Sequence, residues 1–399
     1  MSMTRLRVAF IFTHQIQYFT NLLDELHCRG NVDLLCLYAH RTQDLLDVGF
    51  AKVIKWDNRE DVGFRSFVLP GGWVARFLQP RNTFRVSLFS ELEAFNPDVI
   101  HLNGFSNTVQ WQAWLWARVR NRKIVARGDG DTLPKLAPAK RAWHSRWITM
   151  LFCRHVDHFF FQGVENRKYW LDRGAREDRM TWVPCVPDSR VYRQVVYPTI
   201  ESRDKFRADL GIHPHDRVFV VSGKLDPRKR PQDALEALAT VKDARGRLWF
   251  VGSGILEHSL RARAAELGIQ ERVHFWGFQN QTQLPRILQA ADVCVHPSEF
   301  DPWPYSVLEC ALSGQVLLLS DRTGSHPDLV GAVGGGMTFS CGDVDDLASK
   351  MSQLCSDDAM LRRFQDHLHT KLNAYTEAVF CEIFEGVIRK LAIPAGGTD

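Results

Sequence analysis

The sequence contains no long hydrophobic run and no closely paired cysteines. No apolar stretch approaches the roughly 20 residues that a membrane-spanning helix needs, so no such helix is expected. The nine cysteines occur singly and form no C-x-x-C pair, which argues against a zinc site. The odd number of cysteines and the lack of a secretion signal favour a reducing, cytoplasmic compartment.

A strong excess of charge of one sign is also missing. The formal net charge is +4, the basic residues are dispersed, and no nucleic-acid-binding motif accompanies them. We therefore expect no nucleic-acid partner. With 45% hydrophobic and 24% charged residues, the composition is typical of a globular protein with a substantial core. A length of 399 residues suits two domains of similar size.

Short β-branched or aromatic segments alternate with longer amphipathic segments in both halves of the chain. In the first half we expect strands at 7–12, 32–39, 123–129, 158–163 and 180–185, and a helix followed by a strand over 87–103. In the second half we expect strands at 217–225, 247–254, 273–278, 292–298 and 315–321, and then mostly helix over 344–392. This alternation predicts parallel sheets covered by helices on both faces.

The fold class is therefore predicted to be α/β, with two doubly wound, Rossmann-like domains facing each other across a cleft. The polar, aperiodic stretch that starts at residue 188 marks the connection between them. The predicted parts are an N-terminal domain over 1–190, a C-terminal domain over 191–378, and a final helix in 379–399 that returns to the N-terminal domain. Ligands of such sheets bind at the carboxyl ends of the strands.

Two lysines follow the first strand of the second half. Lys224 comes at the strand end, and Lys229 lies just before a helix, between Arg228 and Arg230. A helix N-terminus with cations nearby is an anion site, because free N–H groups and the helix dipole add to the side-chain charges. Alone, such a pattern is also typical of a solvated basic turn.

The next two strands end in glycines and in aromatic residues. Gly252 and Gly254 would let the backbone approach a ligand closely, although a glycine-rich turn is often only a turn. Trp276 and Phe278 could flank a nucleotide base, or could simply pack against their neighbours.

Two acids, Asp301 and Glu309, are separated by seven residues after the strand at 292–298. A helix is expected to start near Tyr305, with Pro304 at its beginning. Asp301 would then lie over the cleft, and Glu309 would lie about one turn into the helix. Two carboxylates so placed can accept hydrogen bonds from different hydroxyl pairs of one polyhydroxylated ligand. The alternative is a helix-capping Asp and a surface Glu.

Several motifs in the right order together resemble the GT-B glycosyltransferases of retaining family four, the group 1 type. The lysine pair and the acid-x(7)-acid pair occur with "FVGSG", "RVHFWGF", "LPRILQAADVCVHPS" and "GDVDDLASKM". The run "LECALSGQVLLLSDRTGSHPDLV" (308–330) is similar to the family's "EAMACGxPVVxSxxGGxxELV". The resemblance covers nearly the whole chain.

The resemblance implies a role for each of these residues. Lys224 and Lys229 would bind the diphosphate of a nucleotide-sugar donor, and Lys229 would stabilise it as it leaves. Asp301 would orient the transferred sugar, and Glu309 would hold the ribose hydroxyls. Other expected donor contacts are Gly252, Gly254, Trp276, Phe278, Pro302, Ser306, Thr323 and Gly324. The chain departs from the family at Asp301, where Glu is usual, and at Pro304, where glycine is usual.

The first half offers fewer signals. The loop "THQIQYF" after the first strand contains His14 and Gln15, and "RGDGD" after a later strand contains Arg127 and Asp129. Asp129 is the nearest candidate for the reacting centre. His14, Gln15, Arg127 and His101 are candidate acceptor-side residues, although a lone histidine is often structural. The D-x-D string also fits a metal, but GT-B enzymes generally use none, so no metal or other cofactor is expected.

The predicted function is a retaining transfer of a sugar from a nucleotide-diphosphate donor to a glycan, lipid-linked or small-molecule acceptor. The segments 71–82 and 140–154 combine basic and aromatic residues, which leaves open a peripheral contact with the inner face of a membrane. For 140–154, packing on the sheet is the favoured interpretation, and the loop 71–82 is the better candidate for contact with the acceptor. The alternatives are a nucleotide-sugar-binding protein with weak or no transferase activity and a GT-B epimerase or phosphorylase-like enzyme.

Overall fold

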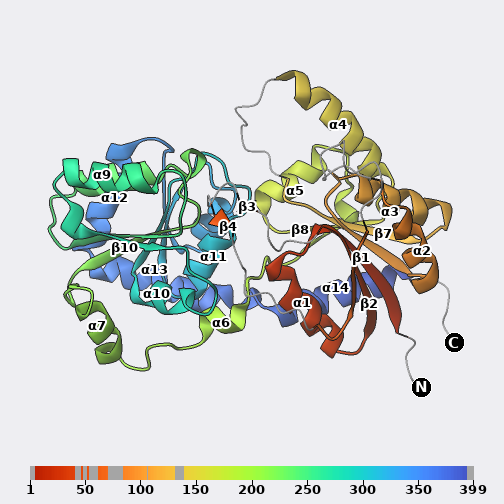
Figure 1. Cartoon of the computed structure of the whole chain (residues 1–399), viewed down its shortest axis with the longest axis horizontal. Helices are drawn as coiled ribbons and strands as arrows, with labels where there is room; N and C mark the ends of the chain where they lie inside the picture. Colours follow the sequence, from red (N-terminus) through yellow and green to blue (C-terminus); the bar gives the residue numbers. More distant parts are fainter. Residues whose placement is uncertain are drawn as a thin grey trace. The chain divides into compact units, whose positions relative to one another are not determined.

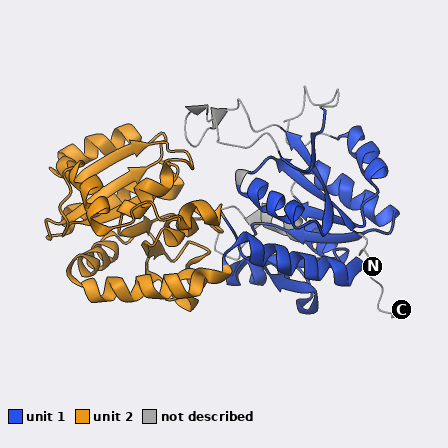
Figure 2. Cartoon of the chain, turned by 90° about the horizontal axis from the view of Figure 1, so that it is seen from below, with its two compact units in different colours: residues 1–43, 58–186, 375–399 blue, residues 44–57, 187–374 orange. Residues whose placement is uncertain are grey.

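The computed structural model describes residues 5–40, 46–47, 52–53, 62–70, 84–105, 107–130 and 139–392. The chain divides into unit 1, residues 1–43, 58–186 and 375–399, and unit 2, residues 44–57 and 187–374 (Figure 2). The domain boundaries were expected between residues 190 and 191 and between residues 378 and 379. The boundaries between the two observed units fall between residues 186 and 187 and between residues 374 and 375. Residues 46–47 and 52–53, which were expected in the N-terminal domain, are grouped with unit 2.

Unit 1 is built on a seven-stranded parallel sheet in the order β5-β2-β1-β6-β7-β8-β9. Figure 1 labels β1, β2, β7 and β8 of this sheet. Its strands are β1 (Leu6–His14), β2 (Val32–His40), β5 (Arg65–Val68), β6 (Val99–Asn103), β7 (Lys123–Arg127), β8 (His158–Phe161) and β9 (Met180–Trp182). Its helices are α1 (Gln17–Cys28), α2 (Val86–Phe95), α3 (Thr108–Val119), α4 (Ala139–Arg154), α5 (Val164–Leu171) and α14 (Glu377–Ala392). The short antiparallel pair β3 (Leu46–Asp47) and β4 (Lys52–Val53) stands apart from this sheet.

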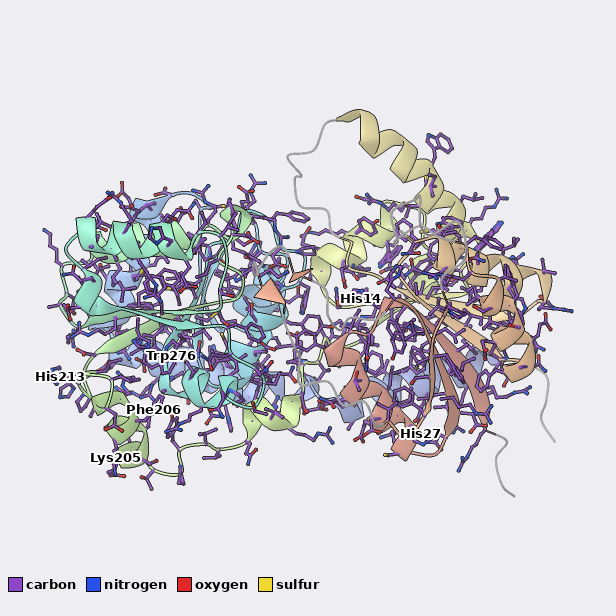
Figure 3. All side chains as sticks on the ribbon, viewed as in Figure 1. His14, His27, Lys205, Phe206, His213 and Trp276 are labelled. Atoms are coloured by element: carbon purple, nitrogen blue, oxygen red, sulfur yellow. The ribbon has the colours of Figure 1, made fainter. Side chains whose placement is uncertain are left out.

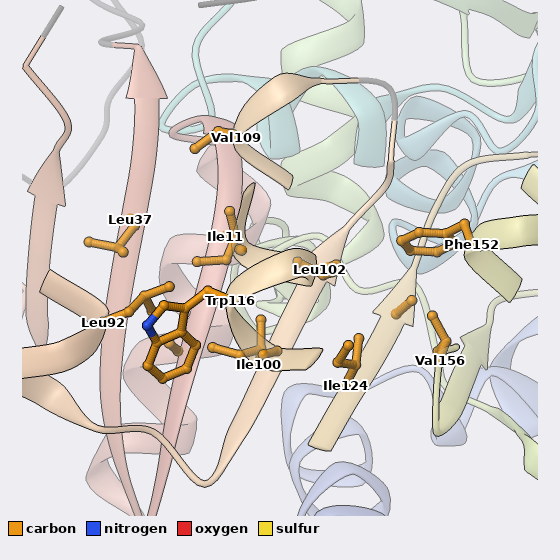
Figure 4. Close-up of a cluster of buried hydrophobic side chains, with 14 of the residues drawn as sticks. Ile11, Leu37, Leu92, Ile100, Leu102, Val109, Trp116, Ile124, Phe152 and Val156 are labelled. Carbon is orange, nitrogen blue, oxygen red and sulfur yellow. The ribbon is translucent and has the colours of Figure 1, made fainter. Parts of the chain in front are cut away.

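Both faces of the unit 1 sheet carry a buried apolar cluster. One cluster joins the sheet to α2, α3, α4 and α5, and Leu92, Trp116 and Phe152 belong to it (Figure 4). The other joins the opposite face to α1 and α14, through Leu23 and Phe384 among others. The last helix therefore returns to the first unit across nearly the whole length of the chain, because its apolar stripe fills that face.

Unit 2 repeats the plan with a six-stranded parallel sheet in the order β12-β11-β10-β13-β14-β15. Its strands are β10 (Arg217–Ser222), β11 (Gly246–Val251), β12 (Val273–Gly277), β13 (Val293–His296), β14 (Val316–Ser320) and β15 (Gly336–Phe339). Its helices are α6 (Ser189–Arg193), α7 (Ile200–Ala208), α8 (Pro231–Thr240), α9 (Glu257–Glu266), α10 (Leu284–Ala290), α11 (Tyr305–Leu312), α12 (Val344–Ser356) and α13 (Asp358–Lys371). Helices α8, α9 and α12 cover one face, and α11 packs on β13 and β14.

The prediction of two doubly wound parallel sheets is confirmed, with two omissions. The sequence reasoning did not anticipate β5 or β15, which are both edge strands of four residues. All four β5 residues are exposed, and β15 begins with a glycine, so neither has the apolar, β-branched pattern of a buried strand. Their pairing depends on the neighbouring strand more than on their own composition.

Candidate functional site

The ends of β10 and β13 bring a cation and a carboxylate into direct contact. These strands are neighbours in a parallel sheet, so the loops that follow them share one edge. The two loops are joined by Glu299, whose N–H donates to the carbonyl of Arg228 at 3.0 Å. As a result, the Lys229 ammonium forms an ion pair with the Asp301 carboxylate. The sequence had predicted both residues for one site, and the structure brings them together.

Asp301 is held as a buried anion. Its residue is only 8% exposed. Burial raises the pKa of Asp301, but the Lys229 ammonium and a hydrogen bond from His296 lower it by more, so the pKa lies well below the usual range of an Asp. The carboxylate is therefore ionised at neutral pH.

His296 is a member of this cluster that the sequence reasoning missed. It is the last residue of β13, it is 3% exposed, and its Nε2 lies 3.3 Å from Asp301 Oδ2. Burial lowers the pKa of His296, and the contact with Asp301 offsets only part of that effect. The neutral ring must then donate from Nε2 to the carboxylate. A histidine at a strand end, five residues before the acid, was the only available signal in the sequence.

The second acid is also buried. The alternative of a helix-capping Asp301 and a surface Glu309 is therefore wrong. Glu309 lies one turn into α11 and is 3% exposed. Pro304 is the N-cap of that helix, and none of the described side chains caps it. The phenol of Tyr192, from α6, donates a 2.9 Å hydrogen bond to Glu309 Oε1. Tyr192 is fully buried, and no local pattern in the sequence connects it with Glu309.

The loop after β14 lies against the Asp301 loop. Thr323 forms a parallel bridge with Asp301, and the Gly324 N–H donates to the Asp301 carbonyl at 2.8 Å. A Cβ on Gly324 would collide with the carbonyl of Pro302. Thr323 is fully buried and its hydroxyl lies 3.1 Å from that of Ser320, whereas Ser306, in the first turn of α11, is partly exposed. Thr323, Gly324 and Pro302, which were predicted as donor contacts, thus gather around Asp301.

The two glycines after β11 lie against the loop that follows β10. A Cβ on Gly252 would collide with the carbonyl of Gly223, and one on Gly254 with that of Leu225. The loops after β10 and β11 therefore abut, with the Leu225 N–H bonded to the Ser253 carbonyl at 3.0 Å. Space for the neighbouring loop accounts for both glycines, and a ligand is not needed to explain them. Lys224, between Gly223 and Leu225, keeps a partly exposed side chain.

The structure shows a packing role for Trp276, which was the alternative to base stacking. Its ring stacks on Phe206 of α7, with centroids 6.2 Å apart and planes at 16° (Figure 3). Its other neighbours include Trp249, with centroids 5.4 Å apart. Trp276 is thus part of the packing between β12 and α7. Phe278 lies just beyond the strand and is partly exposed.

In unit 1, Gln162 joins two of the predicted residues. The Arg127 guanidinium donates from Nη2 to Gln162 Oε1 at 2.9 Å, and Gln162 Nε2 donates to Asp129 Oδ1 at 3.2 Å. Arg127 is 2% exposed and lies over the Phe19 ring at 5.1 Å, whereas Asp129 is exposed. The polar chain runs along the carboxyl ends of β7 and β8, which are neighbours in the sheet. Gln162 had not been singled out in the sequence.

His101 is a core residue, so its assignment to an acceptor site is wrong. It is 0% exposed, its ring centroid lies 4.6 Å from that of Phe10, and neither ring nitrogen has a hydrogen-bond partner among the described residues. Burial and the nearby Arg127 lower the pKa of His101 to about 3, so the ring is neutral. By contrast, His14 is exposed and its Nδ1 lies 2.8 Å from the Thr13 hydroxyl, while Gln15 is partly exposed.

Other predictions concern metals, membranes and acceptor loops. Within the described ranges, no three His, Cys, Asp or Glu side chains are grouped as metal ligands would be. Among the helices described, none combines the length and the apolar character that a membrane crossing requires. The predicted acceptor loop 71–82 lies outside the described residues.

Comparison with known proteins identifies the family of this chain. Residues 202–368 match the model of the glycosyl transferases group 1, and residues 16–185 match that of a glycosyl transferase 4-like domain. The chain belongs to the group 1 glycosyltransferase family. Similar curated proteins include a D-inositol 3-phosphate glycosyltransferase of Nocardia farcinica, 30% identical over 199 residues, which are 48% of this chain and 43% of that protein. Another, from Segniliparus rotundus, is 32% identical over 27% of this chain and 25% of that protein.

Solved structures show that this group 1 family member has the same fold over almost its full length. Anabaena HepE in complex with UDP is 15% identical, with a TM-score of 0.72, over 96% of this chain and 100% of that chain. Sucrose-phosphate synthase from Thermosynechococcus elongatus is 18% identical, with a TM-score of 0.73, over 97% and 99% of the two chains. The predicted GT-B class, with two Rossmann-like domains, is therefore confirmed. The chain matches less than half the length of these two curated relatives in sequence.

Proposed function

We propose that this family member is a retaining glycosyltransferase that takes a sugar from a nucleotide-diphosphate donor. The observation that carries the proposal is the contact of Lys229 and Asp301 at the carboxyl edge of the unit 2 sheet, the edge where ligands of such sheets bind. Anabaena HepE, which shares the fold, has been crystallised with UDP and with UDP-glucose. The acceptor would be a glycan, a lipid-linked molecule or a small molecule, and the reaction would take place in the cytoplasm.

Breaking the bond between the sugar and the diphosphate creates negative charge on the leaving phosphate. Lys229 lies two residues before α8, whose first residue is Pro231. The N-terminus of this ten-residue helix and the Lys229 ammonium can stabilise the leaving diphosphate together. Lys224, on the same loop and partly exposed, would add a second charge. No metal ion is required in this scheme.

The two acids would hold the two ends of the sugar nucleotide. Asp301 would accept hydrogen bonds from hydroxyls of the transferred sugar, next to the backbone of Pro302 and Gly324. Glu309 would accept from the ribose hydroxyls, and its Oε1 is oriented by the Tyr192 phenol. In unit 1, Asp129, Gln162 and Arg127 form the polar group proposed for the acceptor side, together with His14 and Gln15.

The test is an assay of nucleoside diphosphate release. The purified protein is incubated with UDP-, GDP- and dTDP-sugars, with and without candidate acceptors, and the sugar product is analysed for its anomeric configuration. We expect one donor to release its nucleoside diphosphate faster when the acceptor is present, with retained configuration at the transferred sugar. Inverted configuration would contradict the retaining mechanism, and the absence of binding by every nucleotide would contradict the whole assignment.

A second candidate function is nucleotide-sugar binding without transfer. The ion pair between Lys229 and Asp301 favours it, because each of the two charges partly neutralises the other. The same assay separates the two functions. Saturable binding of a nucleotide sugar, without release of the diphosphate in the presence of any acceptor, would support the second candidate.

The hydrogen bond from Tyr192 to Glu309 makes Tyr192 a positioning residue in this proposal. We expect Tyr192→Phe to raise the KM for the donor about tenfold and to change kcat little, because a hydrogen bond to a carboxylate contributes about 1.5 kcal/mol. The matched control is Tyr197→Phe, which removes a phenol that donates to the Arg286 carbonyl at 3.0 Å in the same unit. Steady-state kinetics with varied donor concentration would measure both variants. Equal KM values for the two would show that Tyr192 does not orient a donor contact.

A further inference from the structure

Helix α4 of unit 1 exposes an apolar face. The exposed fractions are 57% for Trp147, 51% for Ile148, 38% for Met150 and 52% for Leu151. At 100° per residue, positions 147, 150, 151 and 154 share one side of the helix, and 148 lies at its margin. The opposite side is buried, with Phe152 at 0% and Cys153 at 4% exposure. The helix thus packs on the sheet, as the sequence had favoured for 140–154, but only along one side.

A pocket of about 290 Å³ opens next to this face. Met150 and Arg154 of α4 belong to its lining, so the exposed face runs into it. Val156 and Phe159 contribute apolar surface. Its remaining polar lining consists of arginines from the segment between α5 and β9, so that four arginines in all surround the pocket: Arg154, Arg173, Arg176 and Arg179.

The positive charge of the pocket is poorly compensated. In the part of the chain that the structure describes, Arg176 forms the only ion pair of the four, with Asp178. Arg173 lies over the Tyr169 ring at 3.6 Å and donates from Nη1 to the Tyr169 carbonyl at 3.2 Å. Its Nε is buried and has no hydrogen-bond partner in the portion of the protein that the structure describes. A guanidinium so arranged retains donors for an anion that enters the pocket.

The pocket lies away from the site proposed for sugar transfer. Its arginines precede β8 (His158–Phe161) and β9 (Met180–Trp182), so they gather at the amino ends of these strands. Arg127 and Gln162, which end β7 and follow β8, lie at the opposite edge of the same parallel sheet. The pocket lining therefore includes none of the residues proposed to contact the reacting sugar.

We propose that the exposed face of α4 and the arginine pocket dock unit 1 on a bilayer that contains anionic phospholipid. Trp147, Ile148 and Leu151 enter the headgroup region with their apolar side chains, as an amphipathic helix does when it lies in the interface. The arginines surround the phosphate of one lipid headgroup through charge-assisted hydrogen bonds. An apolar helix face continuous with a basic pocket matches the order of acyl chain and phosphate in a phospholipid.

Vesicle flotation with the full chain tests this docking and needs no donor or acceptor. We expect binding to vesicles of phosphatidylcholine with phosphatidylglycerol, no binding to phosphatidylcholine alone, and weaker binding as salt is added. The triple variant Arg154→Glu, Arg176→Glu and Arg179→Glu should bind at least about 100-fold more weakly, since each basic residue near an anionic surface contributes about fivefold. The double variant Ile148→Ser and Leu151→Ser should lose roughly tenfold or more.

Matched control variants have the same kinds of substitution, to Glu and to Ser, at exposed positions of unit 2. The charge control replaces three exposed basic residues, Lys205, Lys242 and Arg362, by Glu; Lys205 is on α7 (Figure 3). The apolar control replaces Val195 and Ile200, which are 70% and 67% exposed, by Ser. Circular dichroism verifies that each variant is folded.

Three outcomes would overturn the proposal. They are equal binding to neutral and anionic vesicles, an equal loss in the test and control variants, and a pocket that is saturated by soluble glycerol phosphate while the chain does not bind vesicles. The last result would assign the arginines to a soluble anion. Vesicle flotation does not depend on catalysis. A chain that does not bind vesicles could therefore still transfer a sugar, and a chain that transfers no sugar could still bind vesicles.

Discussion

Replacement of Lys229 by alanine is expected to lower kcat about 100- to 1,000-fold, with a smaller effect on the KM of the donor. Removal of one group that stabilises charge developing in the transition state costs about that much in other enzymes. Lys229 meets the structural condition for this role, because its ammonium stands at the carboxyl edge of the sheet, close to the start of α8. The measurement is the rate of nucleoside diphosphate release at saturating donor.

Two further variants separate the role of the Lys229 charge from its role in the fold. Lys242→Ala removes an exposed lysine of the same unit and should keep full activity. Lys229→Arg keeps the charge beside Asp301 and should recover part of the lost rate. If Lys229→Ala turns over donor as fast as Lys242→Ala, then Lys229 does not stabilise the leaving group. A urea titration of each variant would show whether a lower rate merely reflects unfolding.

Replacement of Asp292 by alanine is expected to lower the free energy of unfolding by about 3–5 kcal/mol, the typical cost of removing one partner from a buried ion pair. Asp292 follows α10 and precedes β13, and it is 5% exposed. Its carboxylate accepts hydrogen bonds from Arg207 at 3.1 Å, from Arg203 at 2.6 Å and from the Val218 N–H at 2.7 Å. Arg207 is 1% exposed, so the variant would leave a guanidinium buried without its carboxylate.

The control for Asp292 is an ion pair at the surface. Glu257 and Arg261 pair at 3.0 Å on α9, with side chains 26% and 51% exposed. Glu257→Ala should cost less than about 1 kcal/mol, because solvent screens such pairs. Urea unfolding of both variants provides the comparison, and similar losses for the two would contradict the importance of burial.

The pH dependence of stability gives a second test of Asp292. Burial raises the pKa of Asp292, but Arg207 and Arg203 lower it by more, so the folded-state pKa lies below the ordinary value. A carboxyl with a lowered folded pKa adds stability above its unfolded pKa of about 3.9, and this stability is lost as the pH falls toward the folded pKa. Below about pH 4, wild-type stability should therefore decline more steeply than that of Asp292→Ala. Parallel curves for the two proteins would contradict this contribution.

Some contacts could be predicted without the structure. These are contacts between residues that are close along the chain and contacts between loops that follow neighbouring strands of one sheet. Lys229 follows β10 and Asp301 follows β13, and any parallel sheet that places these strands side by side also brings the two loops together. Both α/β units were predictable for the same reason, since alternating buried strands and amphipathic helices leave few other ways to bury the apolar surface.

The contacts that distant segments make could not be predicted in this way. Tyr192 reaches Glu309 across 117 residues, and Gln162 reaches Arg127 across 35, with no local pattern to connect either pair. The errors have the same origin. His101 lies near the end of a strand like a site residue, yet Phe10 and Phe384 cover it, and Phe384 comes from the last helix of the chain.

By itself, the amino-acid sequence determined the two-unit α/β class, the family, and the cations and acids placed at strand ends, because these depend on local periodicity and on spacing within a motif. Only the tertiary structure decided which of these side chains are buried, ionised and paired. It showed that Trp276 packs on Phe206, that Gly252 makes room for a neighbouring loop, and that one face of α4 is exposed. The physical reason is that burial and pairing depend on atoms brought from elsewhere in the chain, which a short stretch of sequence does not specify.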